Sequence, residues 1–387
     1  MMFDKIAERA KGVTPFIVME ILERAKQLQA QGRRVIELQI GEPDFDTPAV
    51  IKEAHDRALA EGHTHYTPSL GDPALKEALA AHYKKRYQVD VAPERFFICP
   101  GSSSGMTMLF GSLINPGDEI IMSDPHYPCY DNMVKFFGGR PRLIPVREEE
   151  GFLYRPEDIR ANLSDKVKTV VINSPANPTG TILDENRLKE IAALDRLIIS
   201  DEIYHGLTYG DELEHSILEY TDNAVVVSGF SKLFAMTGWR LGYVILPPDP
   251  DYLRAMLFMT QNFFLSTSAA VQKAGICALE KSWPEVEAMR RTYDRRRRLL
   301  LNGLNKLGLT VKVEPTGAFY ILANAGHLSR DSYALAFDIL EKAGVDTAPG
   351  IDFGPGAEGF LRFSYASSEA NIEEALDRLK KYLEDRP

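Results

Sequence analysis

An amine and a guanidinium lie close together in the stretch SGFSKLFAMTGWRLG, which occupies residues 228–242. Lys232 follows the apolar run 224–227, which predicts a buried strand, and Arg240 comes eight residues after it. A lysine becomes a nucleophile when burial or a neighbouring cation destabilises its ammonium, whose ordinary pKa is about 10.4. Arg240 can supply that cation, and its guanidinium can also hold a phosphate with two parallel hydrogen bonds. The stretch therefore predicts a reactive amine beside an anion site.

Four further side chains suit a flat heterocyclic ligand. Asp201 follows the apolar run 197–199 and would be a buried carboxylate that needs a cationic partner, such as a protonated ring nitrogen. Tyr204 and Asn177 can donate hydrogen bonds to an oxyanion on that ring, and Tyr127 can stack on its face. A helix N-cap is the alternative for Asp201, and a plain Asn-Pro turn is the alternative for Asn177.

The segment PGSSSGM at 100–106 admits two kinds of chemistry. It follows a strand-like run and precedes a helix-like one, so Ser102 and Ser103 can turn hydroxyl and backbone N–H groups toward a phosphate. Gly101, Ser103 and Gly105 also match G-x-S-x-G, the pattern of a serine-hydrolase nucleophile. That hypothesis needs an acid, a histidine and an upstream HGG loop, and HGG does not occur in the sequence. An ordinary helix cap is the third interpretation.

These groups together match one cofactor. Pyridoxal 5′-phosphate (PLP) carries an aldehyde, a phosphate, a pyridine nitrogen and a phenolic oxygen, and it is held by a lysine with an acidic partner for the ring nitrogen. Ser228 and Ser231 both precede the lysine, and the sequence leaves open which of them contacts the phosphate. By contrast, FGPGAEG at 353–359 matches G-x-G-x-x-G but contains a proline and precedes a strand, so it predicts a turn and no dinucleotide site.

The residues with chemical potential follow short apolar runs that predict strands. The runs are 95–99, 119–122, 169–172, 197–199 and 224–227. Helix-like segments lie between them, for example 106–113 and 184–194, so the pattern favours an α/β fold with a mostly parallel sheet flanked by helices. Ligands of such sheets bind beyond the carboxyl ends of the strands. We therefore expect the loops after these strands to form one site.

The pattern of the sequence changes near residue 284. A basic helix is expected at 285–307, followed by short strands within 311–324 and 359–366 and by helices near 332–344 and 369–383. We predict a large PLP-binding domain of residues 46–283 and a smaller α+β domain of residues 1–45 and 284–387. The run RRTYDRRRR at 290–298 is interpreted as the solvated face of the basic helix and not as a nucleic-acid patch.

Composition narrows the class of protein further. The chain has 387 residues and a formal net charge of −10, which argues against nucleic acid as a partner. Three cysteines without C-x-x-C spacing argue against a disulfide framework or a zinc site, and no metal is expected. The N-terminus lacks a signal-like apolar region, and no run approaches the roughly 18 apolar residues of a membrane span. We expect a cytoplasmic enzyme with no membrane partner.

From GEPDFDTP at 41–48 to LRFSYA at 361–366, the sequence resembles the class I/II aminotransferases, the fold-type-I PLP enzymes related to aspartate aminotransferase. GFSKLFAMTGWRLG at 229–242 is similar to the lysine attachment signature of that family. The resemblance implies transamination of an L-amino acid with a 2-oxo acid. Lys232 would hold PLP as an aldimine and move the substrate proton, Asp201 would keep the ring protonated, and pyridoxamine phosphate would be the intermediate.

The resemblance also implies roles for the other site residues. Asn177 and Tyr204 would bond the phenolic oxygen; Ser102, Ser103, Ser231 and Arg240 would hold the phosphate; Tyr127 would stack on the ring; and Gly41, Asn177 and Arg362 would bind the substrate. Tyr66, in HYTPSLG, is similar to the tyrosine that reaches the phosphate of the neighbouring subunit, which implies a homodimer with shared active sites.

Other functions on the same fold remain open at this point. A PLP-dependent C–S β-lyase would share every cofactor residue. A PLP-binding transcription regulator would need a DNA-binding extension, for which we expect no room before Gly41. By the same resemblance, residues 12–17 lie over the site and are mostly apolar. Acidic, small neutral and aromatic donors all stay open, with a broad or aspartate-like enzyme favoured.

Overall fold

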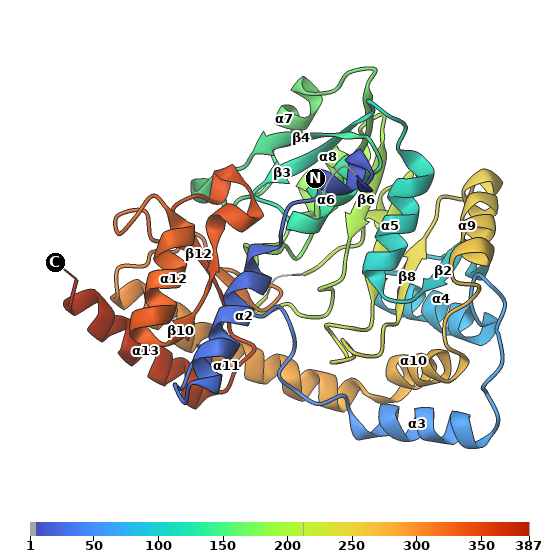
Figure 1. The fold of residues 1–387 in the computed structure, drawn as a ribbon. Helices are drawn as coiled ribbons and strands as arrows, with labels where there is room; N and C mark the ends of the chain where they lie inside the picture. Colours follow the sequence, from blue (N-terminus) through green and yellow to red (C-terminus); the bar gives the residue numbers. More distant parts are fainter. Residues whose placement is uncertain (1–4, 212, 387) are drawn as a thin grey trace.

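The computed structural model describes residues 5–211 and 213–386, and its largest element is a seven-stranded sheet (Figure 1). In order across the sheet, the strands are β2 (Phe96–Cys99), β8 (Gly242–Ile245), β7 (Ala224–Gly229), β6 (Leu197–Asp201), β5 (Val167–Asn173), β3 (Glu119–Asp124) and β4 (Arg140–Pro145). The pairs that β8 makes with β2 and β7 are antiparallel, and the other pairs are parallel. The prediction of an α/β fold with a mostly parallel sheet is confirmed.

Helices cover both faces of this sheet, because apolar side chains alternate to either side of each strand. In β2, Phe96 and Ile98 join one buried cluster, while Phe97 and Cys99 join another. The second cluster also takes side chains from α5 (Ser102–Leu113), α6 (Pro128–Phe136) and α9 (Pro250–Phe263). The first takes them from α3 (Ala49–Ala60), α4 (Pro73–Tyr87), α7 (Pro156–Ala161), α8 (Glu185–Ala192) and α10 (Ala269–Lys281). Burial on two faces fixes the register of each strand and the place of the loop that follows it.

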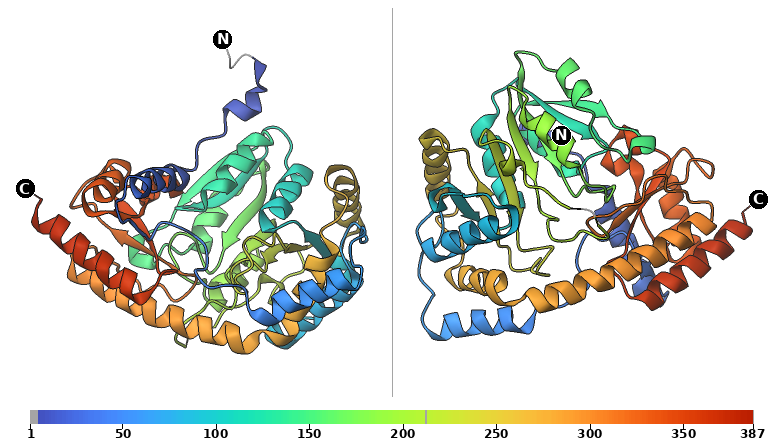
Figure 2. Two further views of the ribbon diagram at one scale, coloured as in Figure 1. Left: turned by 60° about the horizontal axis from the view of Figure 1, so that its bottom comes forward. Right: turned by 180° about the vertical axis from the view of Figure 1, so that it is seen from behind.

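A second group of elements packs beside the large sheet. Its strands form an antiparallel sheet of β11 (Ala348–Pro349), β12 (Phe360–Ser364) and β9 (Tyr320–Asn324) and a parallel pair of β1 (Ile36–Glu37) and β10 (Val345–Asp346). Its helices are α2 (Ile17–Ala30), α12 (Ser332–Ala343) and α13 (Glu369–Glu384). The long helix α11 (Trp283–Lys306) runs beneath both groups, with α13 alongside it (Figures 1 and 2). Within the described part of the chain, none of the helices combines the length and the apolar character that crossing a membrane requires.

The N-terminal segment crosses from one group of elements to the other (Figure 2). Helix α1 (Glu8–Lys11) contacts α6, and the backbone N–H of Thr14 donates to Asn132 Oδ1 at 2.9 Å. A few residues later, the N–H groups of Ile17 and Val18 donate to the carboxylate of Asp352 at 3.0 and 3.2 Å. The chain between these anchors therefore spans the gap between the two groups.

The basic run at 290–298 differs in part from its interpretation as a solvated face. Arg296 and Arg297 are buried, and they pair with Asp44 and with Asp294 and Glu314. The interpretation was wrong for these two arginines, because α11 is covered on that side by the loops that reach it. The glycine-rich segment 353–359 is a pair of tight turns, η5 (Gly350–Phe353) and η6 (Pro355–Ala357), which confirms the predicted turn.

Candidate functional site

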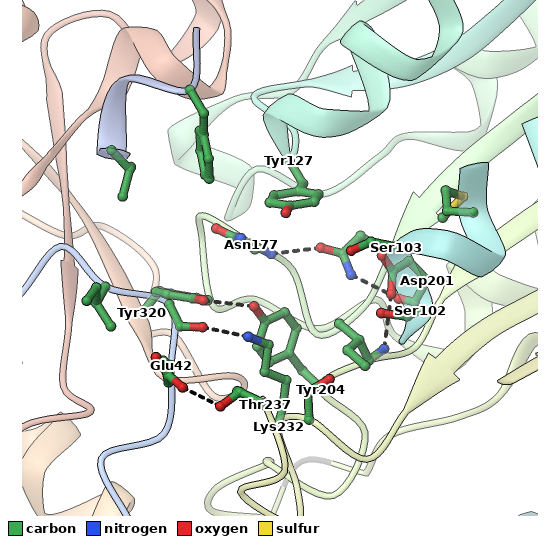
Figure 3. Close-up of a pocket in the computed structure, with 18 of the residues that line it drawn as sticks. Glu42, Ser102, Ser103, Tyr127, Asn177, Asp201, Tyr204, Lys232, Thr237 and Tyr320 are labelled. Carbon is green, nitrogen blue, oxygen red and sulfur yellow. Dashed lines mark hydrogen bonds between the residues drawn. The ribbon is translucent and has the colours of Figure 1, made fainter. Parts of the chain in front are cut away.

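A cavity of about 470 Å³ lies where the loops after the strands meet the N-terminal segment (Figure 3). Its lining includes eleven of the twelve residues singled out from the sequence: Gly41, Ser102, Ser103, Tyr127, Asn177, Asp201, Tyr204, Ser231, Lys232, Arg240 and Arg362. Tyr66 is the exception, since it is 81% exposed and lies outside this lining. The expectation that loops distant in sequence form one site therefore holds for these residues.

Lys232 lies in the loop between the antiparallel strands β7 and β8, three residues after the buried strand β7 ends at Gly229. Its amine donates to the carbonyl oxygen of Gly41 at 2.5 Å. Burial lowers the pKa of Lys232 to about 8; Glu42 opposes this shift, and Arg362 and Arg240 add to it. The amine is thus a stronger nucleophile at neutral pH than an ordinary lysine, mainly because it is desolvated.

An anion site is built from the start of α5 and from Arg240. Helix α5 begins at Ser102, four residues before the expected start, so the free N–H groups of its first turn lie at the cavity. The guanidinium of Arg240 packs on Gly101, where an added Cβ would lie 2.2 Å from Nη2. Ser231 lines the cavity, whereas Ser228 Oγ donates to the carbonyl of Glu202 at 3.1 Å within the sheet. Of the two serines left open by the sequence, only Ser231 is among the described lining residues.

We expect Gly101→Ala to weaken phosphate binding about tenfold or more. Gly101 has a φ of +86°, and its Cβ would displace the Arg240 guanidinium. Gly117→Ala is a matched control, because its φ is +92° and nothing lies within 4 Å of its added Cβ. Both changes place a Cβ at a positive φ, and Gly101, with a ψ of 151°, lies in a region essentially restricted to glycine, which adds backbone strain of about 1–3 kcal/mol. Calorimetric titration of the apoprotein with PLP should separate them, and equal affinities in the two variants would contradict the assignment of this anion site.

Asp201 ends β6 and is buried beneath the cavity. Burial raises the pKa of its carboxyl to about 6, and a hydrogen bond donated by Tyr130 opposes that shift. The N–H of Ile203 donates to Oδ1 at 3.1 Å, which fixes the direction of the carboxylate. A buried carboxylate held in this way favours a cationic partner, such as a protonated ring nitrogen.

Arg362 is almost fully buried, and its guanidinium lies between the rings of Tyr320 and Phe353 at 4.4 and 4.7 Å. Nη1 donates to Asn177 Oδ1 at 2.9 Å, and Nη2 donates to the carbonyl of Gln39 at 2.5 Å. Among the described residues, Nε has no hydrogen-bond partner. Arg362 is nevertheless among the lining residues of the cavity, where its guanidinium could hold a carboxylate ligand.

Two tyrosines belong to the site and were not identified from the sequence. The hydroxyl of Tyr320 lies 2.8 Å from that of Tyr204, and Tyr130 donates to Asp201. Tyr130 carried a signal, because it comes three residues after Tyr127, the residue that precedes α6, and the centroids of the two rings lie 5.4 Å apart. Figure 3 shows Tyr127, Asp201, Tyr204 and Lys232 around a shared space.

The serine-hydrolase hypothesis finds no support at this site. Ser103 does line the cavity, but no histidine is among the described lining residues. A serine nucleophile of that class needs a histidine base within hydrogen-bond reach. Ser103 is therefore placed as part of the anion site.

Comparison with known proteins agrees with this geometry. Residues 33–379 match the family model described as aminotransferase class I and II. The aspartate aminotransferase of Pyrococcus horikoshii is 40% identical over 98% of this chain and 97% of its own length. The (5-formylfuran-3-yl)methyl phosphate transaminase of Methanocaldococcus jannaschii is 38% identical over 98% of this chain and 99% of its own. The structure of Thermus thermophilus aspartate aminotransferase with maleate superimposes with a TM-score of 0.92 at 38% identity, covering 97% of this chain and 99% of that one.

These similarities extend over nearly the whole chain and favour transamination over the β-lyase alternative. They agree with the resemblance found in the sequence and with a cavity that holds an amine, an anion site and a carboxylate. The chain belongs to the class I and II aminotransferases and catalyses PLP-dependent transamination between an amino acid and a 2-oxo acid.

Proposed function

We propose that the residues of this cavity have the roles in PLP-dependent transamination that the sequence resemblance implies. The donor set fits PLP on three counts. The first turn of α5 with Ser231 and Arg240 offers N–H, hydroxyl and guanidinium groups to a phosphate. Asp201 offers a buried carboxylate to a ring nitrogen, and Lys232 offers an amine to an aldehyde. Tyr127 is placed to stack on the ring.

When bound, PLP supplies an electron sink that makes the Cα–H bond of an amino acid acidic. Lys232 then takes or gives the proton at Nζ, because an amine with a pKa of about 8 can do both near neutral pH. Arg362 and Asn177, joined by their hydrogen bond, hold the substrate α-carboxylate and so orient the Cα–H bond. Tyr204, whose hydroxyl lies 2.8 Å from that of Tyr320, would donate a hydrogen bond to the phenolic oxygen of bound PLP.

One observation carries this proposal: Lys232, Asp201 and Arg362 line the same cavity. Burial there lowers the pKa of Lys232 to about 8 and raises the pKa of Asp201 to about 6, so both pKa values lie near neutral pH. It is tested by mixing the purified holoenzyme with an L-amino acid and following the visible absorbance of the bound cofactor. The band should bleach with the donor and return with a 2-oxo acid. Release of pyruvate and thiol from a cysteine conjugate without any 2-oxo acid would instead indicate a β-lyase.

Covalent loading of PLP should depend on pH in a way that reports on Lys232. Its amine is neutral above its pKa of about 8, so the loading rate should rise by roughly fiftyfold from pH 6 to pH 8 and then level off. An unshifted lysine would continue to gain neutral amine up to about pH 10. Stopped-flow absorbance of apoprotein mixed with PLP measures this rate. A rate that still climbs tenfold per unit above pH 9 would contradict a desolvated Lys232.

We also propose that the enzyme works as a cytoplasmic homodimer in which Tyr66 reaches the phosphate of the neighbouring subunit. The exposure of Tyr66 at 81% supports this, because an aromatic ring of that size is free to contact a second chain. We keep the division into a large domain of residues 46–283 and a small domain of residues 1–45 and 284–387. Sedimentation of the purified protein as a single chain would contradict the homodimer.

A further inference from the structure

The cations of the cavity are all committed to other groups. Among the described lining residues, the cationic side chains are Lys232, Arg240 and Arg362. Lys232 is the nucleophile, Arg240 lies on Gly101 at the anion site, and Arg362 faces the α-carboxylate. Within one chain, a second carboxylate on the substrate would therefore find no described guanidinium or ammonium that is not already engaged.

One part of the cavity lining near Arg362 is apolar. Phe16, Val18, Met19 and Leu22, at the start of α2 and just before it, line the cavity together, and we call them the N-terminal wall. Val18 belongs to the same buried cluster as Phe353, whose ring lies 4.7 Å from the Arg362 guanidinium. Phe16 packs edge-on against Tyr127 with ring centroids 6.2 Å apart. The wall therefore reaches from the α-carboxylate site to the ring that covers the cofactor.

Besides Arg362, carboxyl groups lie near the N-terminal wall and elsewhere in the cavity lining. Asp352 lies directly behind it and accepts the N–H groups of Ile17 and Val18 at 3.0 and 3.2 Å. Glu42 also lines the cavity and accepts a hydrogen bond from Thr237. A substrate carboxylate placed against the apolar side chains of this wall would be desolvated without a partner on the wall.

We infer that the N-terminal wall is the subsite for the substrate side chain, and that it selects large apolar or aromatic amino acids over aspartate and glutamate. This inference rests on the proposed function and names its substrate class. Burial of a Leu or Phe side chain against such a wall is worth a factor of about ten or more in binding. An unpaired carboxylate loses a comparable factor.

The first test compares kcat/KM of the holoenzyme for L-phenylalanine, L-leucine, L-aspartate and L-glutamate, with L-alanine as the reference because its methyl group is too short to span the wall. We expect phenylalanine and leucine to exceed alanine about tenfold or more, and aspartate and glutamate to fall below it. Higher values for aspartate or glutamate than for phenylalanine and leucine would overturn the inference. No detectable turnover of any of these amino acids, alanine included, would instead contradict the proposed function.

A second test changes the wall itself. Met19 is 49% exposed, so Met19→Lys places a cation at the wall without burying it, and Met19→Gln is the uncharged control of similar length. We expect Met19→Lys to lower the preference for phenylalanine over aspartate about tenfold, and Met19→Gln to change it much less. An unchanged preference in Met19→Lys would overturn the inference.

Binding of ligands that cannot react provides a readout independent of turnover. 3-Phenylpropionate and succinate each carry a carboxylate at one end. At the other end, 3-phenylpropionate would present a phenyl ring to the wall, and succinate a second carboxylate. Calorimetry on the holoenzyme should give a dissociation constant for 3-phenylpropionate about tenfold below that for succinate, and Met19→Lys should narrow the difference. Tighter binding of succinate to the unaltered enzyme would overturn the assignment of the wall.

Discussion

Lys232→Ala should reduce kcat by about 10⁵-fold or more, because it removes both the covalent attachment of the cofactor and the group that moves the Cα proton. The amine donates to Gly41 and is desolvated in the cavity, and no other lysine is among the described lining residues. Turnover of an amino acid and a 2-oxo acid, followed by a coupled assay, measures the loss.

Cofactor binding separates this effect from misfolding. The anion site and Asp201 stay intact in Lys232→Ala, so the variant should still bind PLP, now reversibly and without the covalent link. Lys232→Arg is a useful companion, because it keeps a cation of similar length but lacks a nucleophilic amine. Near-normal turnover in either variant would show that the chemistry takes place elsewhere.

Asp201→Asn should have two opposite effects, a large loss of activity and a gain in apoprotein stability. The loss is expected to be about 10³-fold in kcat, because an amide cannot keep a ring nitrogen protonated. The carboxylate is buried and accepts hydrogen bonds from Tyr130 and Ile203, and the oxygen of an amide side chain can accept in the same place.

The gain in stability follows from the raised pKa of Asp201. In the folded apoprotein this pKa is about 6, against an ordinary value of 3.8, so the protonated form is favoured by folding. That contribution is present below about pH 4 and is lost as pH rises through 6, which costs about 2–3 kcal/mol at pH 8. Urea unfolding of the apoproteins should therefore show Asp201→Asn to be more stable at pH 8, with a smaller difference at pH 4. Equal stability of the two proteins at pH 8 would mean that Asp201 is not desolvated.

Much of the site could be predicted because strand ends in a parallel sheet share an edge. Asp201 ends β6, Asn177 follows β5, and Lys232 follows β7, so the register of adjacent strands brings them together. Apolar runs next to polar loops are local signals, and each could be recognised separately. The assignment of Arg362 depended on the resemblance instead, because no local pattern around it indicates a carboxylate ligand.

The features that were missed depend on contacts between distant segments. Tyr320 reaches Tyr204 only because β9 packs against the loop after β6, which no local pattern reveals. The strands β4 (RPRLIP) and β8 (GYVI) were not identified. Neither sequence has the clear apolar and polar alternation that marks a strand in isolation. Arg296 and Arg297 look like surface residues in a basic run, and their burial depends on acidic partners far along the chain.

The two hydrogen bonds from Ile17 and Val18 to Asp352 bear on how the amino-donor specificity of such an enzyme could change. They hold the backbone of the N-terminal wall in addition to the packing of its side chains, so the position of the wall depends only in part on which side chains it carries. The residues that face the substrate can then be exchanged while Lys232, Asp201 and Arg362 stay in place. Selection for a new amino donor, in nature or in the laboratory, therefore has a small set of positions to explore that is separable from the catalytic machinery.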